Sequence, residues 1–253
     1  MLHLVSLRLD ARKLYAFARR SRAVGRDLDE GYAVHALLAA LFDHGATAPD
    51  RLAPKPFHIA SSGDRVLQVL GYATVDHAAL RERASSFADP VAWGVCDLEA
   101  LASKPMPSAF PSATRLGFAV RACPIRRIAK RGPMERDRAE VDAFLAKSWE
   151  LGPDVTLDRE AVYRDWLAEE LAKEGAAKLV EASMSRFQLD RFHRRTQGAD
   201  RKGSEPRRPD ILFEGVLEVG DPGAFAGRLA RGVGRHRAFG FGMLLLRPAG
   251  KSA

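Results

Sequence analysis

Two residues one helical turn apart are the first candidates for chemistry. Tyr32 and His35 are three positions apart in the run 27–43, so they share one side of a predicted helix. Histidine has an unperturbed pKa of about 6.5 and can both give and take protons near neutral pH. A histidine on the flank of an apolar stripe can also have a purely structural part, and the pattern alone leaves both interpretations open.

A glycine-rich basic stretch near the C-terminus, residues 231–246, is the second candidate. Two Gly-x-Gly pairs bracket basic residues here, and an apolar run follows; the residues are Gly232, Gly234, Arg235, His236, Arg237, Gly240 and Gly242. Glycines let a backbone approach a partner closely, and their amides can face an anion, while arginines donate to phosphate. A tight helix-to-strand turn with solvated arginines is the alternative. The order is neither that of a Rossmann fingerprint nor that of a P-loop, since both place the glycines after a strand and before a helix.

The helix that carries Tyr32 and His35 is the clearest element of the first half. Its apolar stripe is Val34, Leu37, Leu38 and Leu41. Asp27 and Glu30 have the spacing of a capping box, although Asp29 is an alternative cap. Residues 10–26 before it are basic, and part of this run is a candidate helix.

The elements around this helix predict a ferredoxin-like order. We expect strands at 2–9, 55–60, 65–70 and 90–96, and a second helix at 74–87. With the helix at 27–43, this is β-α-β-β-α-β. We therefore expect an N-terminal domain over 1–101, followed by a linker over 102–114 that contains three prolines.

The second half predicts the same order again, in a domain over 115–253. We expect a strand at 115–124, a basic loop at 125–136, helices at 138–149 and 158–173, and strands at 178–192 and 211–219. Asp221 and Pro222 begin a last helix, and the glycine-rich stretch leads to a final strand. The predicted class is α+β, with two tandem ferredoxin-like domains. Outside the glycine-rich stretch, the basic residues that are candidates for contacts with a polyanion are Arg126, Arg127, Arg194, Arg195, Arg201 and Lys202.

Charge and composition narrow the function classes. The net charge is +8, and it is concentrated: 115–138 holds eight Lys/Arg against two Asp/Glu, and 186–208 holds eight against three. Such segments are typical of nucleic-acid binding. Only Cys96 and Cys123 are present, which gives neither a disulfide framework nor a zinc spacing. We expect a cytoplasmic protein with no membrane partner, no cofactor and no metal site.

Three stretches together resemble a known family. Residues 213–219 (Phe-Glu-Gly-Val-Leu-Glu-Val), then Asp-Pro at 221–222, then Gly-x-Gly-x5-Gly-x-Gly-x-Leu-Leu from 232 are similar to the C-terminus of the CRISPR repeat-processing endoribonucleases of the Cascade type, the CasE family. The string at 31–42 resembles the family's first helix. The strand at 115–124 resembles another family segment, but has Cys123 where the family usually has asparagine.

The resemblance implies a function and roles for residues. His35 matches the family's catalytic histidine, and Tyr32 matches a tyrosine that takes part in cleavage in some members. It implies metal-independent cleavage of CRISPR repeat stem-loop RNA, in which a 2′-hydroxyl attacks the adjacent phosphate and leaves a 2′,3′-cyclic phosphate. It also implies that the product is kept and that other Cascade subunits are partners. The alternatives are a non-catalytic RNA-hairpin-binding subunit and a small-molecule phosphate enzyme that uses the glycine-rich stretch.

Overall fold

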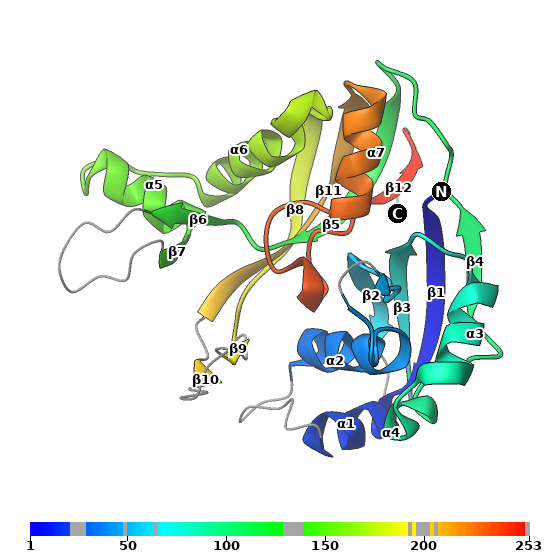
Figure 1. Cartoon of the computed structure of the whole chain (residues 1–253). Coiled ribbons are helices and arrows are strands. Elements are labelled where there is room, and N and C mark those ends of the chain that lie inside the picture. Colours follow the sequence, from blue (N-terminus) through cyan, green and yellow to red (C-terminus); the bar gives the residue numbers. More distant parts are fainter. Residues whose placement is uncertain are drawn as a thin grey trace.

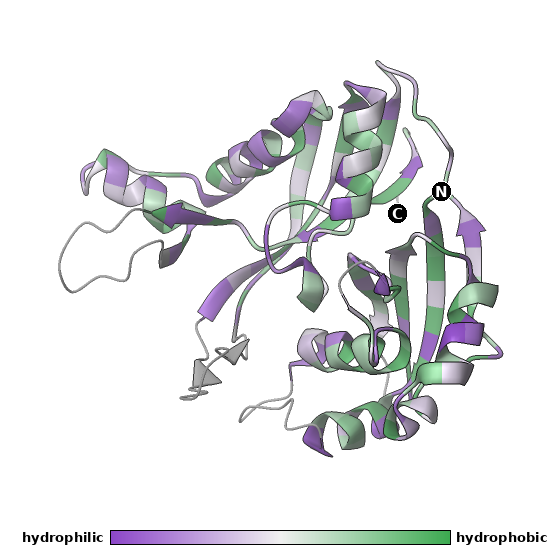
Figure 2. Cartoon of the chain, in the orientation of Figure 1, coloured by the Kyte–Doolittle hydropathy of each residue, from purple (hydrophilic) through white to green (hydrophobic). Residues whose placement is uncertain are grey.

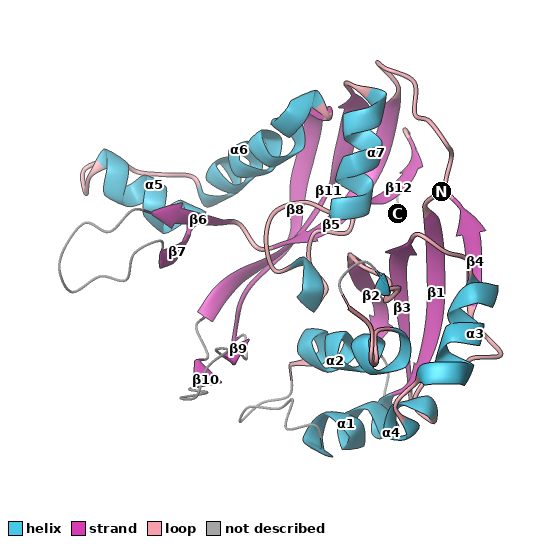
Figure 3. Cartoon of the chain, in the orientation of Figure 1, coloured by secondary structure: helices cyan, strands magenta, loops and turns pink. Residues whose placement is uncertain are grey.

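A computed structural model of the chain describes residues 1–20, 29–47, 50–62, 65–128, 139–191, 194–195, 203–204 and 207–250. Over these residues the chain forms two four-stranded antiparallel sheets with helices packed against them (Figures 1 and 3). The predicted class, α+β with two ferredoxin-like domains, is thereby confirmed. None of the described helices is both long and apolar enough to cross a membrane.

The first sheet has the strand order β2-β3-β1-β4, with every neighbouring pair antiparallel. This is the order of a ferredoxin-like β-α-β-β-α-β domain. Its elements are β1 His3–Asp10, α1 Ala11–Arg20, α2 Glu30–Phe42, β2 Phe57–Ser62, β3 Val66–Ala73, α3 His77–Phe87, α4 Pro90–Trp93 and β4 Ala102–Pro105.

Helix α2 packs its predicted stripe onto this sheet. All four stripe residues are fully buried, and they form one core with the side chains of β1 that alternate toward the helices. Figure 2 agrees with this burial, since apolar residues lie along β1 and α2. Burying each such side chain stabilises the fold by roughly 1.5–3 kcal/mol, so α2 is held firmly on the sheet.

The fourth strand lies elsewhere than expected. The run 90–96 was expected to be a strand, but it begins with helix α4, because Asp89 accepts a hydrogen bond from the Val91 amide at 2.8 Å and Pro90 suits a first helical turn. Strand β4 comes later, at Ala102–Pro105, and pairs with β1 as the edge of the sheet. The first sheet therefore extends into the segment expected to be a linker, and the division of the chain at 114/115 stays a prediction.

The second sheet has the order β12-β5-β11-β8, again antiparallel and again ferredoxin-like. Its elements are β5 Arg115–Ala122, α5 Ala143–Leu151, α6 Arg159–Ala172, the 3-10 helix η2 Lys173–Gly175, β8 Ala177–Arg191, β11 Arg207–Val219, α7 Pro222–Arg231, the 3-10 helix η3 Arg237–Phe239 and β12 Leu245–Pro248. Strands β8 and β11 form a long hairpin whose outer end is hydrophilic (Figure 2).

Two small hairpins project from the second sheet. Strand β6 Ile125–Ile128 lies in the expected basic loop and pairs with β7 Ala139–Asp142. Strand β7 occupies the start of the helix expected at 138–149, because Asp142 caps that helix, α5, which therefore begins only at Ala143. Strand β9 Arg194–Arg195 pairs with β10 Gly203–Ser204 beyond the end of the β8–β11 hairpin (Figure 1). The expected basic loop thus begins as a paired strand.

Aspartates set the start of every described α-helix. A carboxylate of the residue before the helix accepts a backbone hydrogen bond from the first turn, which is worth about 1 kcal/mol per helix. The aspartates are Asp10, Asp29, Asp76, Asp89, Asp142, Asp158 and Asp221. For α2 the cap is therefore Asp29, the second of the two alternatives; Asp27 lies outside the described residues.

The two domains share buried contacts. The hydroxyl of Tyr72 in β3 donates to the Leu244 carbonyl just before β12 at 2.8 Å, and both residues are buried. Leu4 and Leu70, on the face of the first sheet away from its helices, pack against the core of the second domain. At the other end of this interface, η3 lies against α2 and β2 (Figure 1).

The contact between η3 and α2 is a contact between backbones. A Cβ atom at Gly31, in the first turn of α2, would lie 2.3 Å from the carbonyl oxygen of Phe239, and real Cβ atoms do not approach that closely. Only glycine therefore allows the two segments to lie this close.

We predict that Gly31→Ala destabilises the protein by about 1–3 kcal/mol, the usual cost of overpacking. The clash outweighs the roughly 1 kcal/mol by which alanine favours a helix over glycine. Urea unfolding of the full chain measures the difference. Gly94→Ala is the matched control, because Gly94 has ordinary helical geometry and open space around its Cβ position. Equal unfolding free energies for Gly31→Ala and the wild type would contradict the contact.

Candidate active site

Helix α2 places the two candidate catalytic side chains at the domain interface. The Asp29 carboxylate accepts from the Tyr32 amide at 3.0 Å, which fixes the first turn, and His35 follows one turn later. Both side chains are partly buried. Their ring centroids are 6.4 Å apart, so they lie side by side as their spacing predicts.

The glycine turn, residues 232–242, is held mainly by hydrogen bonds that its backbone amides donate. The amide of Gly232 donates to the Arg228 carbonyl at 2.7 Å, and that of Gly242 donates to the Arg121 carbonyl at 2.7 Å. The Val233 amide donates to the Gly242 carbonyl at 2.8 Å, which closes the turn. The amides of Gly232 and Gly242 are already bonded within the chain, so they do not face an anion in this structure, and RNA binding by these two glycines stays a prediction.

The glycines allow neighbouring atoms to come close to the backbone of the turn. All four have positive φ angles, which favour glycine. A Cβ at Gly242 would lie 2.2 Å from the Val233 carbonyl oxygen, and one at Gly234 would lie 2.8 Å from the Trp166 ring. A Cβ at Gly240 would come within 3.3 Å of the Phe57 ring in the first domain. The turn thus packs on both domains, and RNA binding by Gly234 and Gly240 stays a prediction.

Aromatic rings join the glycine turn to the catalytic helix. The Phe239 ring stacks on Tyr32, with centroids 5.8 Å apart and planes at 21°. It meets His35 edge to face, at 5.4 Å and 81°. The two motifs that the sequence singled out, about 200 residues apart, therefore touch through one phenylalanine, which the sequence analysis did not select.

A cavity of about 700 Å³ opens beside these rings. Its lining residues are Tyr32, Lys55, Pro56, Glu140, Ala230, Arg231, Gly234, Arg235, His236, Arg237, Ala238 and Phe239. His35 is not one of them, but its ring touches two that are. Lysine and arginine side chains from both domains line the cavity, which suits it to an anion such as a phosphate.

Glu140 on β7 organises the basic side of the cavity. Its carboxylate lies 2.8 Å from Arg235 Nε and 3.3 Å from both Arg208 Nη2 and His236 Nε2. The hydrogen bond from His236, with help from the two arginines, outweighs burial and lowers the pKa of Glu140 to about 2. Glu140 therefore holds the basic groups in place as a fixed anion.

His35 lies in surroundings that keep it neutral. Burial, and then the positive charges of Lys55 and Arg51, lower its pKa to about 4, while Asp43 opposes them. Lys55 Nζ also pairs with Asp43 Oδ2 at 3.2 Å. Since the unfolded chain takes up the proton at higher pH than the folded one, the free energy of unfolding falls as the pH drops from 6.5 toward 4.

The two ring nitrogens of His35 differ in access. Nδ1 is shielded from solvent and has no hydrogen-bond partner within the described part of the chain. Since RNA cannot reach a shielded atom, Nε2 is the nitrogen that is left to exchange a proton with a substrate.

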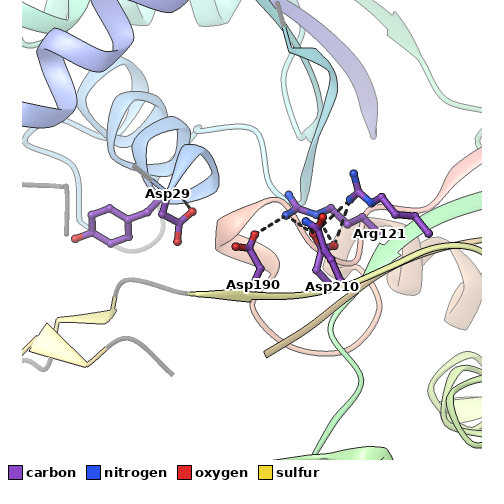
Figure 4. A network of polar contacts seen from close by, with 7 residues as sticks. Asp29, Arg121, Asp190 and Asp210 are labelled. Atoms are coloured by element: carbon purple, nitrogen blue, oxygen red, sulfur yellow. Dashed lines mark hydrogen bonds and ion pairs between the residues drawn. The ribbon is translucent and has the colours of Figure 1, made fainter. Parts of the chain in front are cut away.

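A buried ion pair between β5 and β11 lies beside the glycine turn and supports it (Figure 4). Arg121 on β5 binds Asp210 on β11 through two hydrogen bonds of 2.8 and 2.9 Å, and Asp210 is fully buried. Gln188 and Arg186 on β8 bind the same carboxylate, at 2.7 and 3.3 Å. The Arg121 guanidinium also lies 4.3 Å from the centre of the Phe241 ring, within the turn. Three strands and the turn are thereby tied together.

The predicted RNA-binding arginines fall into two groups. Arg235 and Arg237 line the cavity; the first binds Glu140 and the second donates to the Arg231 carbonyl at 2.7 Å. The others lie on the projecting hairpins: Arg126 and Arg127 on β6, where Arg126 pairs with Glu169 at 2.7 Å, and Arg194 and Arg195 on β9. Arg201 and Lys202 lie outside the described residues.

Lys55 and Glu140 are the charged groups of the site that sequence reasoning missed. Neither residue belongs to a motif. The one sequence signal is Asp43, which follows the apolar stripe of α2 and is a possible partner for a cation such as Lys55. In the described part of the chain no group of His, Cys, Asp and Glu is arranged to hold a metal ion.

We predict that Lys55→Met raises the pKa of His35 from about 4 toward 6.5. The positive charge of Lys55 disfavours the imidazolium, and its removal also leaves Asp43 free to favour it. An NMR pH titration of the His35 ring in the RNA-free protein measures the midpoint. Lys104→Met, on the exposed edge strand β4, should leave it unchanged. A wild-type midpoint in Lys55→Met would contradict this electrostatic account.

Comparison with known proteins agrees with this geometry. Residues 2–248 match the model of a family described as CRISPR associated protein. The chain is 30% identical over 164 residues to the CRISPR-associated endoribonuclease Cse3 of Thermus thermophilus, which covers 62% of this chain and 68% of Cse3.

Two solved structures share the fold. A structure of CRISPR endoribonuclease Cse3 bound to a 19-nucleotide RNA aligns with a TM-score of 0.62 at 23% identity, over 97% of this chain and 100% of that one. A chain of a CRISPR RNA-guided surveillance complex aligns with a TM-score of 0.51 at 15% identity, over 96% and 98%. With the family match over nearly its whole length, this chain belongs to the CRISPR-associated protein family and, within it, to the type I-E CasE group that includes Cse3.

Proposed function

We propose that this protein is a metal-independent endoribonuclease that binds CRISPR repeat hairpins and cuts them to make mature guide RNA. The main support for this proposal is the contact of His35 on α2 with Phe239 of the glycine turn, beside a cavity lined by cations. The name of the Thermus relative, an endoribonuclease, and the RNA in the Cse3 complex point to the same activity.

The reaction we propose is an internal transfer within the RNA. The 2′-oxygen attacks the adjacent phosphorus, the bond from phosphorus to the 5′-oxygen of the next nucleotide breaks, and a 2′,3′-cyclic phosphate and a 5′-hydroxyl remain. His35 Nε2, neutral at pH 7, accepts the proton of the 2′-hydroxyl as general base. The leaving 5′-oxygen takes up a proton from water, and His35 returns its own proton to solvent, so that the enzyme is regenerated. Tyr32 lines the cavity and orients the nucleophile or assists the proton transfer.

Cations of the chain offset the charge of the transition state. Lys55, Arg235 and Arg237 line the cavity in which we place the scissile phosphate. Donors fixed before the reaction stabilise a developing phosphorane charge better than water does, because they need not reorganise. We propose that proton transfer at His35, together with these cations, carries the reaction without a metal ion.

The projecting hairpins supply the rest of the RNA site. We propose that Arg126 and Arg127 on β6, and the basic residues around β9 and β10, contact phosphates of the hairpin stem, where A-form shape is read. The surveillance complex that contains a chain of this fold favours retention of the product and assembly with other Cascade subunits. A non-catalytic RNA-binding subunit is the alternative, and the gathering of Tyr32, His35 and cations at one cavity favours cleavage.

We predict that His35→Ala lowers the single-turnover cleavage rate by about 10² to 10⁴, the usual contribution of acid–base catalysis, and leaves RNA affinity unchanged. The assay uses the purified protein and an end-labelled cognate repeat hairpin in excess EDTA, with the cyclic phosphate as product. His44→Ala is the control, since His44 is exposed just beyond the end of the same helix. Unchanged cleavage by His35→Ala would contradict its role, and binding without cleavage by the wild type would favour the alternative.

A further inference from the structure

Phe239 has an unusual position for a residue of a turn. It belongs to the second domain, yet its carbonyl lies on the backbone of Gly31 and its ring contacts both Tyr32 and His35. It is the described residue of the second domain whose ring touches both candidate catalytic side chains. It also lines the cavity in which we place the scissile phosphate.

Within the described residues, Nδ1 of His35 lacks the hydrogen bond that usually orients a reactive histidine. In most such sites the Nδ1–H group donates to a carbonyl or a carboxylate, which fixes both the ring and its tautomer. Here Nδ1 is shielded and has no such partner in the described part of the chain. Ring packing must therefore set the orientation of the imidazole.

The Phe239 contact has the geometry for this task. Edge-to-face ring pairs prefer centroid separations of about 4.5–7 Å and stabilise a ring beyond the effect of its buried area. The pair with His35 has a separation of 5.4 Å and an interplanar angle of 81°. Tyr32 also contacts His35, at 6.4 Å and 64°, and Phe239 stacks on Tyr32 in turn. Each of the three rings therefore contacts the other two, and Phe239 supports both Tyr32 and His35.

Phe239 is itself held firmly. Its amide donates to the His236 carbonyl at 2.8 Å, and left-handed backbone conformations at His236 (φ 59°) and Gly240 (φ 84°) flank it. The turn beyond it is tied to β5 through the Gly242 amide and the Arg121 carbonyl. The second sheet thus determines where the ring lies.

We propose that Phe239 is a positioning residue of the nuclease site, which orients His35 from the opposite domain and keeps water away from its ring. The proposal rests on the proposed function for its effect on cleavage, but its effect on the histidine is independent of any RNA. His35 keeps its ring contact with Phe239 beside the cavity only while the glycine turn is docked on α2.

The test compares three full-length variants with the wild type. Phe239→Ala removes the ring. Phe239→Tyr keeps it and should rescue the function. Phe87→Ala is the matched control, because Phe87 is 55% exposed at the end of α3 and lies in the first domain away from η3. Three quantities are measured: single-turnover cleavage in EDTA, affinity for a repeat RNA with a 2′-deoxyribose at the cleavage site, and the NMR titration midpoint of His35.

We expect Phe239→Ala to cleave about 10- to 100-fold more slowly, since misplacement of a reacting group by about 1 Å can cost 10²-fold. RNA affinity should stay within about threefold of the wild type, which is below the factor of 10 given by 1.4 kcal/mol. The His35 midpoint should rise from about 4 toward 6.5, because water then reaches the ring. The groups that face His35, namely Lys55, Arg51, Asp43 and Tyr32, are the same in all variants. Phe239→Tyr and Phe87→Ala should behave as the wild type.

Two results would overturn the proposal. The first is a Phe239→Ala protein with the cleavage rate and His35 midpoint of the wild type. The second is a slower rate accompanied by an equal loss of RNA affinity and an unchanged midpoint, which means that the residue only maintains the RNA surface. A wild type that does not cleave refutes the proposed function instead, and the titration alone then decides about Phe239: an unchanged midpoint in Phe239→Ala overturns its positioning role.

Discussion

The structure depends on one close backbone contact between its two domains. The Phe239 carbonyl lies on the first turn of α2 at Gly31, where any Cβ atom would clash. This contact places the glycine turn beside Tyr32 and His35, and it brings cations from both domains around one cavity. Without it, the first domain would hold a histidine without basic neighbours from the turn, and the second would hold a basic turn without a proton acceptor.

Fixed anions make this arrangement possible. A turn rich in arginine repels itself, and buried guanidinium groups need partners. Glu140 binds Arg208, Arg235 and His236 on the cavity side, and Asp210 binds Arg121 and Arg186 behind the turn. Glu140 therefore supports positive charge at the cavity, whereas Asp210 neutralises the buried Arg121 that lies against the turn. Burial and the cations near His35 lower its pKa to about 4, which suits a histidine that must start neutral.

The sequence predicted the parts with local patterns and missed those that arise from tertiary contact. The stripe of α2, both ferredoxin-like orders and the pairing of Tyr32 with His35 follow from periodicity, so they could be read directly. The run 90–96 was read as a strand because short apolar runs are ambiguous, although Asp89 and Pro90 indicated a helix. Phe239, Lys55 and Glu140 carry no local signal, since their importance depends on segments far away in the chain. The glycine amides were assigned to an anion because spacing cannot tell which amides the fold itself uses.

The most direct test of the central claim is a structure of the full-length protein bound to its cognate repeat hairpin with a 2′-deoxyribose at the cleavage site. We expect the scissile phosphate to lie in the cavity between α2 and the glycine turn, with His35 Nε2 within about 3.2 Å of the nucleophilic 2′ position or one water away. Arg235 or Arg237 should contact the same phosphate. A scissile phosphate bound elsewhere, such as along the β6–β7 hairpin with His35 facing no ribose, would contradict the account.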